Sequence, residues 1–187
     1  MELLISRTGD LDGLRGVVRA TVLAACFWLA GAGIPHAALP QDQVDEGQLK
    51  AAVLFNFTKF VQWPPQQGPI VIGLAADDGF GDQLTRMAKG RQINGRDLVV
   101  RYLESDDDAR ACQMVFVSEG AARRAGAILR RVAGSAVLTV GESQGFLADG
   151  GHIRMYLEQN RIRFQINAAN AERAGLKISA QLMTLSR

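Results

Sequence analysis

The stretch "HIRMYLEQNRIRFQIN", residues 152–167, holds two runs in which polar and apolar residues strictly alternate. A two-residue turn at Gln159 and Asn160 would set Met155 opposite Phe164 and give every apolar side chain an apolar partner on one face. A shift of the register by one residue would break all of these pairs. The sequence therefore predicts an antiparallel hairpin whose second face is polar and net basic.

The chain upstream of this hairpin alternates between strand patterns and helix patterns. Short runs rich in β-branched residues indicate buried strands, and Trp63 ends the first helix because two prolines follow it. The predicted strands cover 69–75, 97–103, 112–118 and 135–140, and the predicted helices cover 44–62, 80–90, 120–134 and part of 168–186. We expect a single-domain α/β fold, a layered sheet flanked by helices, in which a mixed sheet ends in the C-terminal antiparallel hairpin.

The N-terminal segment is typical of a secretory signal. Arg15 and Arg19 precede an apolar run, and the small residues of "PHAAL" follow it. We expect a signal peptide over 1–38, cleavage near Ala37 or Ala38, and a folded domain over 39–187. The alternatives are an uncleaved segment that anchors the chain in a membrane and lipid attachment at Cys26 of "LAAC".

The charge and the cysteine count exclude several classes of function. The 187 residues include 21 basic and 19 acidic side chains, and residues 1–38 carry three of each, so the mature chain stays near +2. A chain without a basic tract is not expected to bind nucleic acid. After cleavage Cys112 is the single cysteine, so no internal disulfide can form, and its place at the start of an apolar strand predicts a buried, inert thiol.

Cofactor and metal motifs are weak in this sequence. The segment "GFGDQL", residues 79–84, resembles part of a dinucleotide fingerprint, but Leu84 replaces the third glycine and Asp77 and Asp78 would repel a pyrophosphate. A tight strand-to-helix turn explains these residues equally well. The mature chain offers only His152 as a histidine ligand, so we expect no metal and no cofactor.

No catalytic group is convincing either. Ser118 and Glu119 lie at a predicted strand end, where catalytic residues occur, but only His152 could act as their base. Helix capping by Ser118, with Glu119 near the helix dipole, is the alternative that we favour. We therefore expect a protein without enzymatic activity.

The polar face of the hairpin is the predicted ligand site. Arg154 and Arg163, flanked by His152 and Gln165, could hold a carboxylate or a phosphate between two guanidinium groups. The alternative is a sheet face exposed to water, which antiparallel sheets commonly have.

The helix over 44–62 raises a second question. At 100° per residue, Leu49, Val53, Phe57 and Phe60 share one arc, and Asn56 falls inside it. We expect Asn56 to be a buried amide that satisfies backbone groups where this helix meets the sheet.

Phe55 points away from that arc, beside Lys59 and Gln62. These three residues are a candidate partner-binding surface. Packing of Phe55 against the C-terminal helix is the alternative.

The motifs taken together resemble the YfiR family of exported bacterial proteins over essentially the whole mature chain. The resemblance lies in "KAAVLFNFTKFVQWP", "GRQINGRDLVVRYL", "CQMVFVS" and the tail "RFQINAANAERAGLKISAQLMTL", in order and at family spacing. It implies a periplasmic repressor that binds the periplasmic sensor region of an inner-membrane diguanylate cyclase and keeps cyclic di-GMP low, which limits biofilm formation. It also implies an outer-membrane lipoprotein that sequesters the repressor, and it leaves a homodimer open.

The resemblance suggests a second function and excludes one form of regulation. Some members have been proposed to bind nucleotides or an aromatic amino acid, so a periplasmic small-ligand sensing module is the alternative function. Members for which redox control is proposed carry cysteine pairs, whereas Cys112 has no mature partner. Disulfide-based sensing is not expected here.

Overall fold

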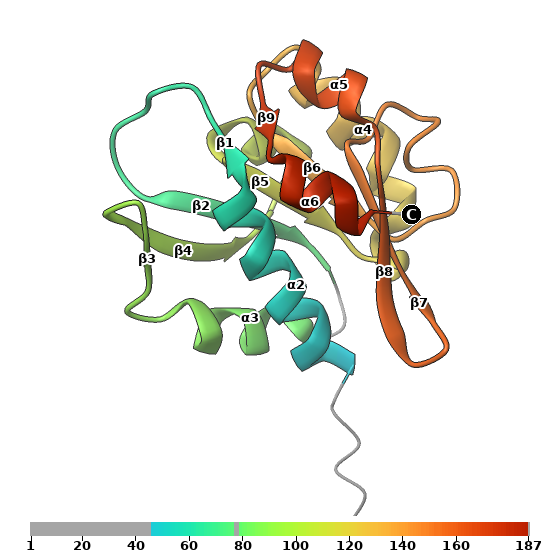
Figure 1. Cartoon of the computed structure of the whole chain (residues 1–187), viewed down its shortest axis with the longest axis horizontal. Helices are drawn as coiled ribbons and strands as arrows, with labels where there is room; N and C mark the ends of the chain where they lie inside the picture. Colours follow the sequence, from blue (N-terminus) through green and yellow to red (C-terminus); the bar gives the residue numbers. More distant parts are fainter. Residues whose placement is uncertain (1–45, 77–78, 187) are drawn as a thin grey trace, which may run out of the picture. The chain divides into compact units, whose positions relative to one another are not determined.

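The computed structural model describes residues 46–76 and 79–186, so the predicted signal segment and its cleavage site lie outside the described residues. Seven strands form one mixed sheet in the order β3-β4-β2-β5-β6-β7-β8 (Figure 1). The strands are β2 (Ile70–Ala75), β3 (Gln92–Ile93), β4 (Arg96–Tyr102), β5 (Met114–Val117), β6 (Leu138–Gly141), β7 (Ile153–Glu158) and β8 (Arg161–Ile166). The five central strands are parallel, and β3 and β8 add antiparallel edges. The predicted mixed α/β sheet with a C-terminal hairpin is confirmed.

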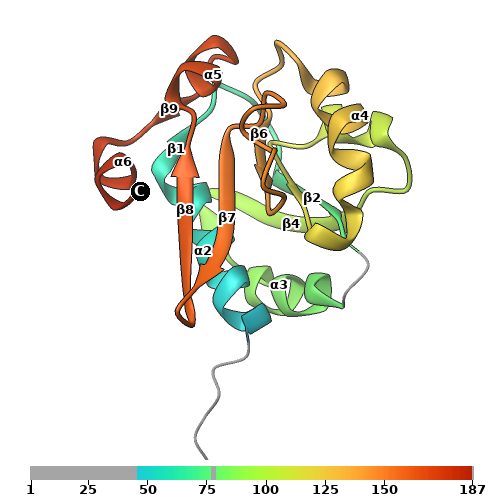
Figure 2. The ribbon, with the colours of Figure 1, turned by 90° about the vertical axis from the view of Figure 1, so that its right-hand side faces the viewer.

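Helices cover both faces of this sheet. They are α2 (Glu46–Phe60), α3 (Phe80–Ala88), α4 (Ala122–Val132), α5 (Ala168–Arg173) and α6 (Ala180–Leu185), with short 3-10 turns η1 (Asp106–Ala111) and η2 (Glu119–Ala121). One buried cluster joins α2, α3 and α6 to one sheet face, and a second joins α4 and η1 to the other. Figure 2 shows α4 on the opposite side of the sheet from α2 and α6.

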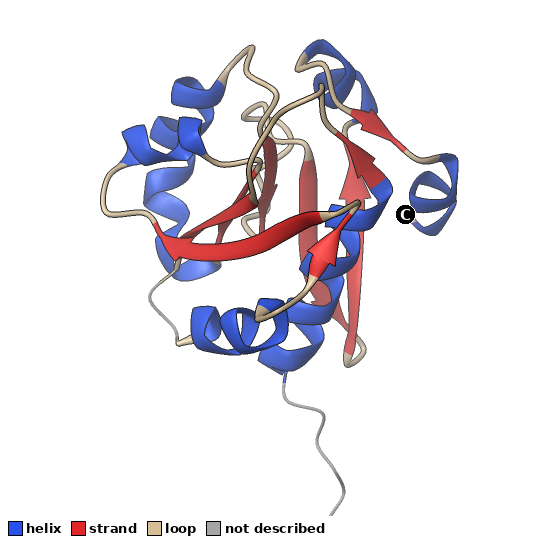
Figure 3. Ribbon diagram, turned by 90° about the vertical axis from the view of Figure 1, so that its left-hand side faces the viewer, coloured by secondary structure: helices blue, strands red, loops and turns tan. Residues whose placement is uncertain are grey.

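Two very short strands complete the described part of the chain. β1 (Val61–Gln62) directly follows α2 and pairs antiparallel with β9 (Lys177–Ile178), which lies between α5 and α6 (Figure 3). The predicted first helix ran to residue 62, so β1 corrects its end. The C-terminal segment was predicted as helix or helix-like turns, and β9 is a strand within it. The pairing becomes available because the C-terminal segment returns beside the end of α2.

The hairpin has the predicted register. Met155 pairs with Phe164, and Ile153 and Leu157 pair with Ile166 and Ile162. Gln159 and Asn160 have φ values of 49° and 60°, so both turn residues are left-handed, as a two-residue hairpin turn of the primed type requires. β7 also pairs with β6 in parallel, which fastens the hairpin to the central sheet.

The buried side of α2 differs from the prediction. Asn56 is exposed, and the buried side chains are Ala51, Leu54, Phe55, Phe57 and Thr58. The helix is covered from two sides, by α3 and by the C-terminal elements, where Phe57 meets Phe164 edge-on at 5.2 Å between ring centroids. The predicted role of Asn56 as a buried lock is therefore wrong. Thr58 is the buried polar residue, and its hydroxyl donates to the Phe55 carbonyl at 2.6 Å.

The loop between β6 and β7 is closed by one aromatic ring. Phe146 is fully buried, and its ring fits between Gly141, at the end of β6, and Gly151, just before β7. A methyl group added to either glycine would overlap the ring. The missing side chains at these two positions therefore let the loop lie close to the strands that it connects.

We predict that Gly141→Ala lowers the free energy of unfolding by about 1–3 kcal/mol, because the added methyl overpacks the Phe146 site. Urea denaturation measures the change. Gly120→Ala is the matched control, since its added methyl would meet only the Ser118 hydroxyl at 3.8 Å. Equal stability of the two variants would contradict the close packing of Phe146.

Candidate functional site

The polar face of the hairpin brings three of the predicted ligand residues together. Arg154 pairs with Gln165 across the strands, and Arg163 pairs with Tyr156, so the two arginines are diagonal neighbours. Side chains alternate between the two faces of a strand, so these four residues share one face. Neighbours in this arrangement lie close enough for both guanidinium groups to reach one anion.

The two guanidinium groups are partly enclosed. The Arg154 guanidinium carbon lies 4.8 Å from the centre of the Tyr156 ring. The Nε atoms of Arg154 and Arg163 are both buried and form no hydrogen bond with any described residue. Arg163 Nε lies 3.5 Å from Glu158 Oε2, a distance that marks an ion pair but exceeds an ordinary hydrogen bond. Each guanidinium group therefore keeps one enclosed donor without a hydrogen bond, and the donor of Arg163 faces a carboxylate of the same hairpin.

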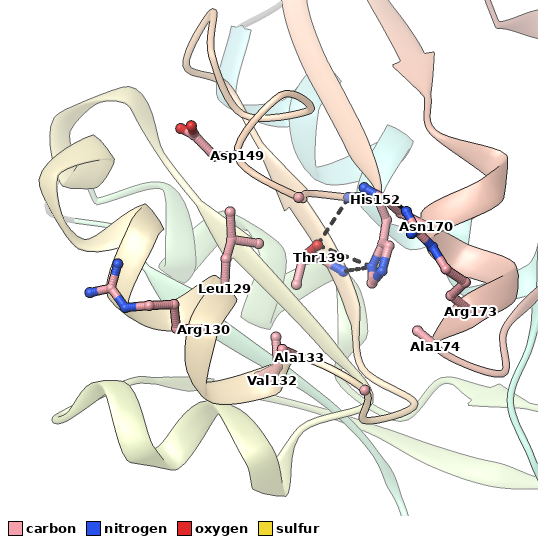
Figure 4. A pocket seen from close by; sticks show the side chains of 12 residues that line it. Leu129, Arg130, Val132, Ala133, Thr139, Asp149, His152, Asn170, Arg173 and Ala174 are labelled. Carbon is pink, nitrogen blue, oxygen red and sulfur yellow. Dashed lines mark hydrogen bonds between the residues drawn. The ribbon is translucent and has the colours of Figure 1, made fainter.

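His152 belongs to a different arrangement. The Thr139 backbone N–H donates to His152 Nδ1 at 3.0 Å, and the His152 backbone N–H donates to Thr139 Oγ1 at 3.1 Å (Figure 4). Because Nδ1 accepts a hydrogen bond from a backbone amide, the ring proton must sit on Nε2. The side chain thus connects β6 to the start of β7, beside α5.

A cavity of about 360 Å³ opens beside His152. The end of α4 contributes Leu129 and Val132 to its wall, and α5 contributes Asn170 and Arg173 (Figure 4). The Asn170 amide oxygen already accepts a hydrogen bond from Arg173. The volume of the cavity falls in the range of small-molecule sites. The structure therefore separates His152, at this cavity, from Arg154 and Arg163, which do not line it.

Burial keeps the His152 imidazole neutral. Desolvation lowers its pKa from 6.5 to about 4, and a weaker hydrogen bond with the Asn170 backbone acts in the opposite direction. The unfolded chain binds a proton at higher pH than the folded chain does. The stability linked to this group is therefore fully present above pH 6.5 and is lost as the pH falls toward 4.

Phe55 is buried rather than exposed, with 6% of its surface accessible. Lys59 Nζ lies 4.4 Å from the centre of its ring, and Arg91 Cζ lies 4.9 Å from it. The expectation of an exposed aromatic is corrected, because Arg91, which follows α3, reaches this ring from a distant part of the sequence. Lys59, Arg91 and Gln62 are the exposed members of this surface.

Ser118 and Cys112 lie inside the protein. Ser118 is 1% exposed and its hydroxyl forms no hydrogen bond with a described residue. It stands before the 3-10 turn η2, but the predicted capping by its side chain is wrong. Cys112 is buried as predicted, and burial raises the pKa of its thiol against the opposing effect of Arg101. A raised thiol pKa and low exposure both disfavour reactivity.

One polar cluster was missed by the sequence reasoning. The Glu142 carboxylate lies 2.7 Å from Lys50 Nζ and accepts a hydrogen bond from the Glu119 backbone N–H at 2.9 Å. It joins α2, η2 and the end of β6. These residues are far apart in sequence and carry no motif, so no sequence signal could have identified the cluster.

The comparisons with known proteins agree with this architecture. Residues 47–187 match the YfiR/HmsC-like family. The chain belongs to this family. Its members are regulatory, non-catalytic proteins of the periplasm that are linked to diguanylate cyclase signalling.

A solved structure supports the fold alone. The chain is similar to the crystal structure of a conserved domain protein from Vibrio cholerae, with a TM-score of 0.53 and 11% identity over 75% of this chain. The match spans 58% of the length of that protein. Within residues 46–76 and 79–186, no helix is long and apolar enough to cross a membrane, and no three potential ligands of the His, Cys, Asp and Glu types cluster as a metal site would need.

We predict that Phe55→Ala lowers the free energy of unfolding by about 3–5 kcal/mol, as Phe57→Ala does, because both rings are buried in the core. Guanidinium denaturation of the two variants measures the effect. If Phe55→Ala unfolds together with the wild type while Phe57→Ala does not, the packing of Phe55 given above is wrong.

We also predict that His152 stays neutral down to about pH 4, which an NMR titration of its ring protons measures. The sequence has two histidines, so a His36→Asn variant leaves a single imidazole signal. The stability linked to this group is on the order of 3 kcal/mol and disappears between pH 6.5 and pH 4. A midpoint near 6.5 would show that the ring is open to water.

Proposed function

We propose that this protein is a periplasmic negative regulator that binds the periplasmic sensor region of an inner-membrane diguanylate cyclase. Binding would lower cyclic di-GMP and so limit biofilm formation. The family match over residues 47–187 is the observation that carries this proposal. Export through the signal segment over 1–38 is part of the proposal.

The described side chains favour binding over catalysis. His152 uses Nδ1 in a hydrogen bond inside the fold, and the Ser118 hydroxyl is buried without a hydrogen-bond partner among the described residues. A general base must reach the proton that it removes, and a nucleophile must reach its substrate. We therefore propose a regulator without enzymatic activity or cofactor.

Repression by binding requires a conformational preference. A regulator can shift the cyclase toward its inactive state only by the difference between its affinities for the two states. An outer-membrane lipoprotein that binds the regulator would remove it from the cyclase and relieve the repression. A homodimer is compatible with this scheme.

The surface beside α2 is one proposed contact for the cyclase. Lys59 and Gln62 are exposed, and the Lys59 ammonium lies over the face of the buried Phe55 ring in a cation–π contact. Within the described part of the chain, neither Lys59 nor Arg91 forms a salt bridge with a carboxylate. Two cations beside one ring can therefore be offered to acidic groups of a partner.

A small-ligand sensing module is the second candidate function. The cavity of about 360 Å³ favours this function, since the cavity lies between two helices and combines apolar walls with His152 and Arg173. Nucleotides and aromatic amino acids are the ligands to test. Saturable thermal stabilisation that is abolished by Arg173→Ala would support this candidate.

We predict that deletion of the gene raises cellular cyclic di-GMP severalfold, and that the wild-type protein restores the original level. Lys59→Gln should restore it only in part, because the substitution removes one exposed charge from the proposed contact. Arg123→Gln, which removes one exposed charge from α4, is the matched control. Unchanged cyclic di-GMP after deletion would reject the proposed function.

A further inference from the structure

We propose that the polar face of the hairpin is a docking surface for acidic side chains of a protein partner. This surface, the arginine face, consists of Arg154, Tyr156, Arg163 and Gln165. The inference rests on the proposed function and assigns the arginine face to carboxylates of the cyclase sensor region.

The charge of the hairpin is concentrated on one side. The charged residues of β7 and β8 are Arg154, Glu158, Arg161 and Arg163, and the register places all four on the same face. Three arginines and one glutamate give this face a net charge of +2 over two strands. A surface of one sign attracts an oppositely charged partner and increases the rate of association.

Each of the two central arginines has one donor without a hydrogen bond inside the described part of the chain. Nε of Arg154 and Nε of Arg163 are buried and form no hydrogen bond with a described residue, although buried polar groups nearly always have a partner. Arg163 Nε faces Glu158 Oε2 in an ion pair at 3.5 Å. A guanidinium group offers Nε and one terminal nitrogen as a fork that matches the two oxygens of a carboxylate. Because both Nε atoms are buried, a partner carboxylate would meet the guanidinium groups at their accessible atoms, and at Arg163 it would compete with Glu158.

The arginine face is also held in place before a partner arrives. Arg154 stacks on Tyr156, and Tyr156 stands opposite Arg163 on paired strands. Groups that are ordered in advance lose less conformational entropy on binding. Arginine and tyrosine are also the residue types that most often dominate the affinity of protein interfaces.

The shape of the face favours a protein over a small molecule. A small ligand usually binds in a concave site that encloses most of its surface. The cavity at His152 is not lined by either arginine, and the hairpin presents a two-stranded ribbon on the side away from α2 (Figure 2). A protein surface can cover such a ribbon, and it supplies carboxylates from aspartate and glutamate side chains.

The test measures binding of the full chain to the purified periplasmic domain of the diguanylate cyclase from the same bacterium by biolayer interferometry. Binding is measured at about 50 and about 300 mM NaCl, because the higher salt concentration screens exposed charges more strongly. The variant Arg154→Gln/Arg163→Gln removes both guanidinium groups. Its matched control, Arg86→Gln/Arg123→Gln, removes two exposed charges from α3 and α4. Circular dichroism melting shows that each variant is folded.

We expect the hairpin variant to lose at least about tenfold in affinity at low salt, and its affinity to depend less on salt. The control should stay within about twofold of the wild type, as peripheral charges do. A hairpin variant that binds like the wild type, with the same salt dependence, would overturn the inference. A wild-type protein that does not bind would instead reject the proposed function.

A titration with inorganic phosphate and with citrate separates a small anion from a protein partner. If either anion stabilises the wild type but not Arg154→Gln/Arg163→Gln, while both proteins bind the cyclase equally, the face is a small-anion site and the docking inference is wrong. If the hairpin variant loses cyclase binding and neither anion stabilises the wild type, the inference is supported.

Discussion

The two-sided pairing of strand β7 is the constraint on which the rest of the structure depends. On one edge β7 runs parallel to β6, and on the other it runs antiparallel to β8. Both pairings must agree on which side chains face the core. Ile153 and Met155 therefore point into the large core cluster, and Arg154 and Tyr156 must point to the opposite face. The position of the polar face is a direct result of core packing.

This dependence explains why the hairpin could be predicted so well. The apolar pairs, the polar pairs and the turn all lie within 152–167, so one short stretch contains the information that fixes the register. Asn160 and Gln159 could be placed in the turn because any other choice would pair apolar with polar residues. The alternation of strands and helices gave the α/β class for a similar reason, since each pattern is local.

The helix α2 and His152 show where such reasoning fails. The face of α2 that is buried depends on α3 and on the C-terminal elements, which cover it from two directions, so a single apolar arc was the wrong description. Arg91 likewise contacts the Phe55 ring from a distant part of the sequence, and the Thr139 backbone N–H donates a hydrogen bond to His152 from strand β6. Contacts between segments that are distant in sequence are not encoded in the periodicity of either segment. The geometry was therefore predicted in part: Arg154 and Arg163 share one face as expected, whereas His152 lies at a separate cavity, and ligand binding at either place stays a prediction.

The end of the sheet at β8 has a consequence for the solubility of the protein. An edge strand exposes backbone donors and acceptors that can pair with a strand of another molecule, and natural proteins limit this with charged side chains. β8 is the last strand of the sheet, and it carries Arg161 and Arg163. Like charges on two such strands would repel each other and oppose edge-to-edge aggregation. The same arginines would attract a negatively charged surface. The charge of this edge would therefore oppose pairing with a second copy of the chain and favour contact with an acidic partner.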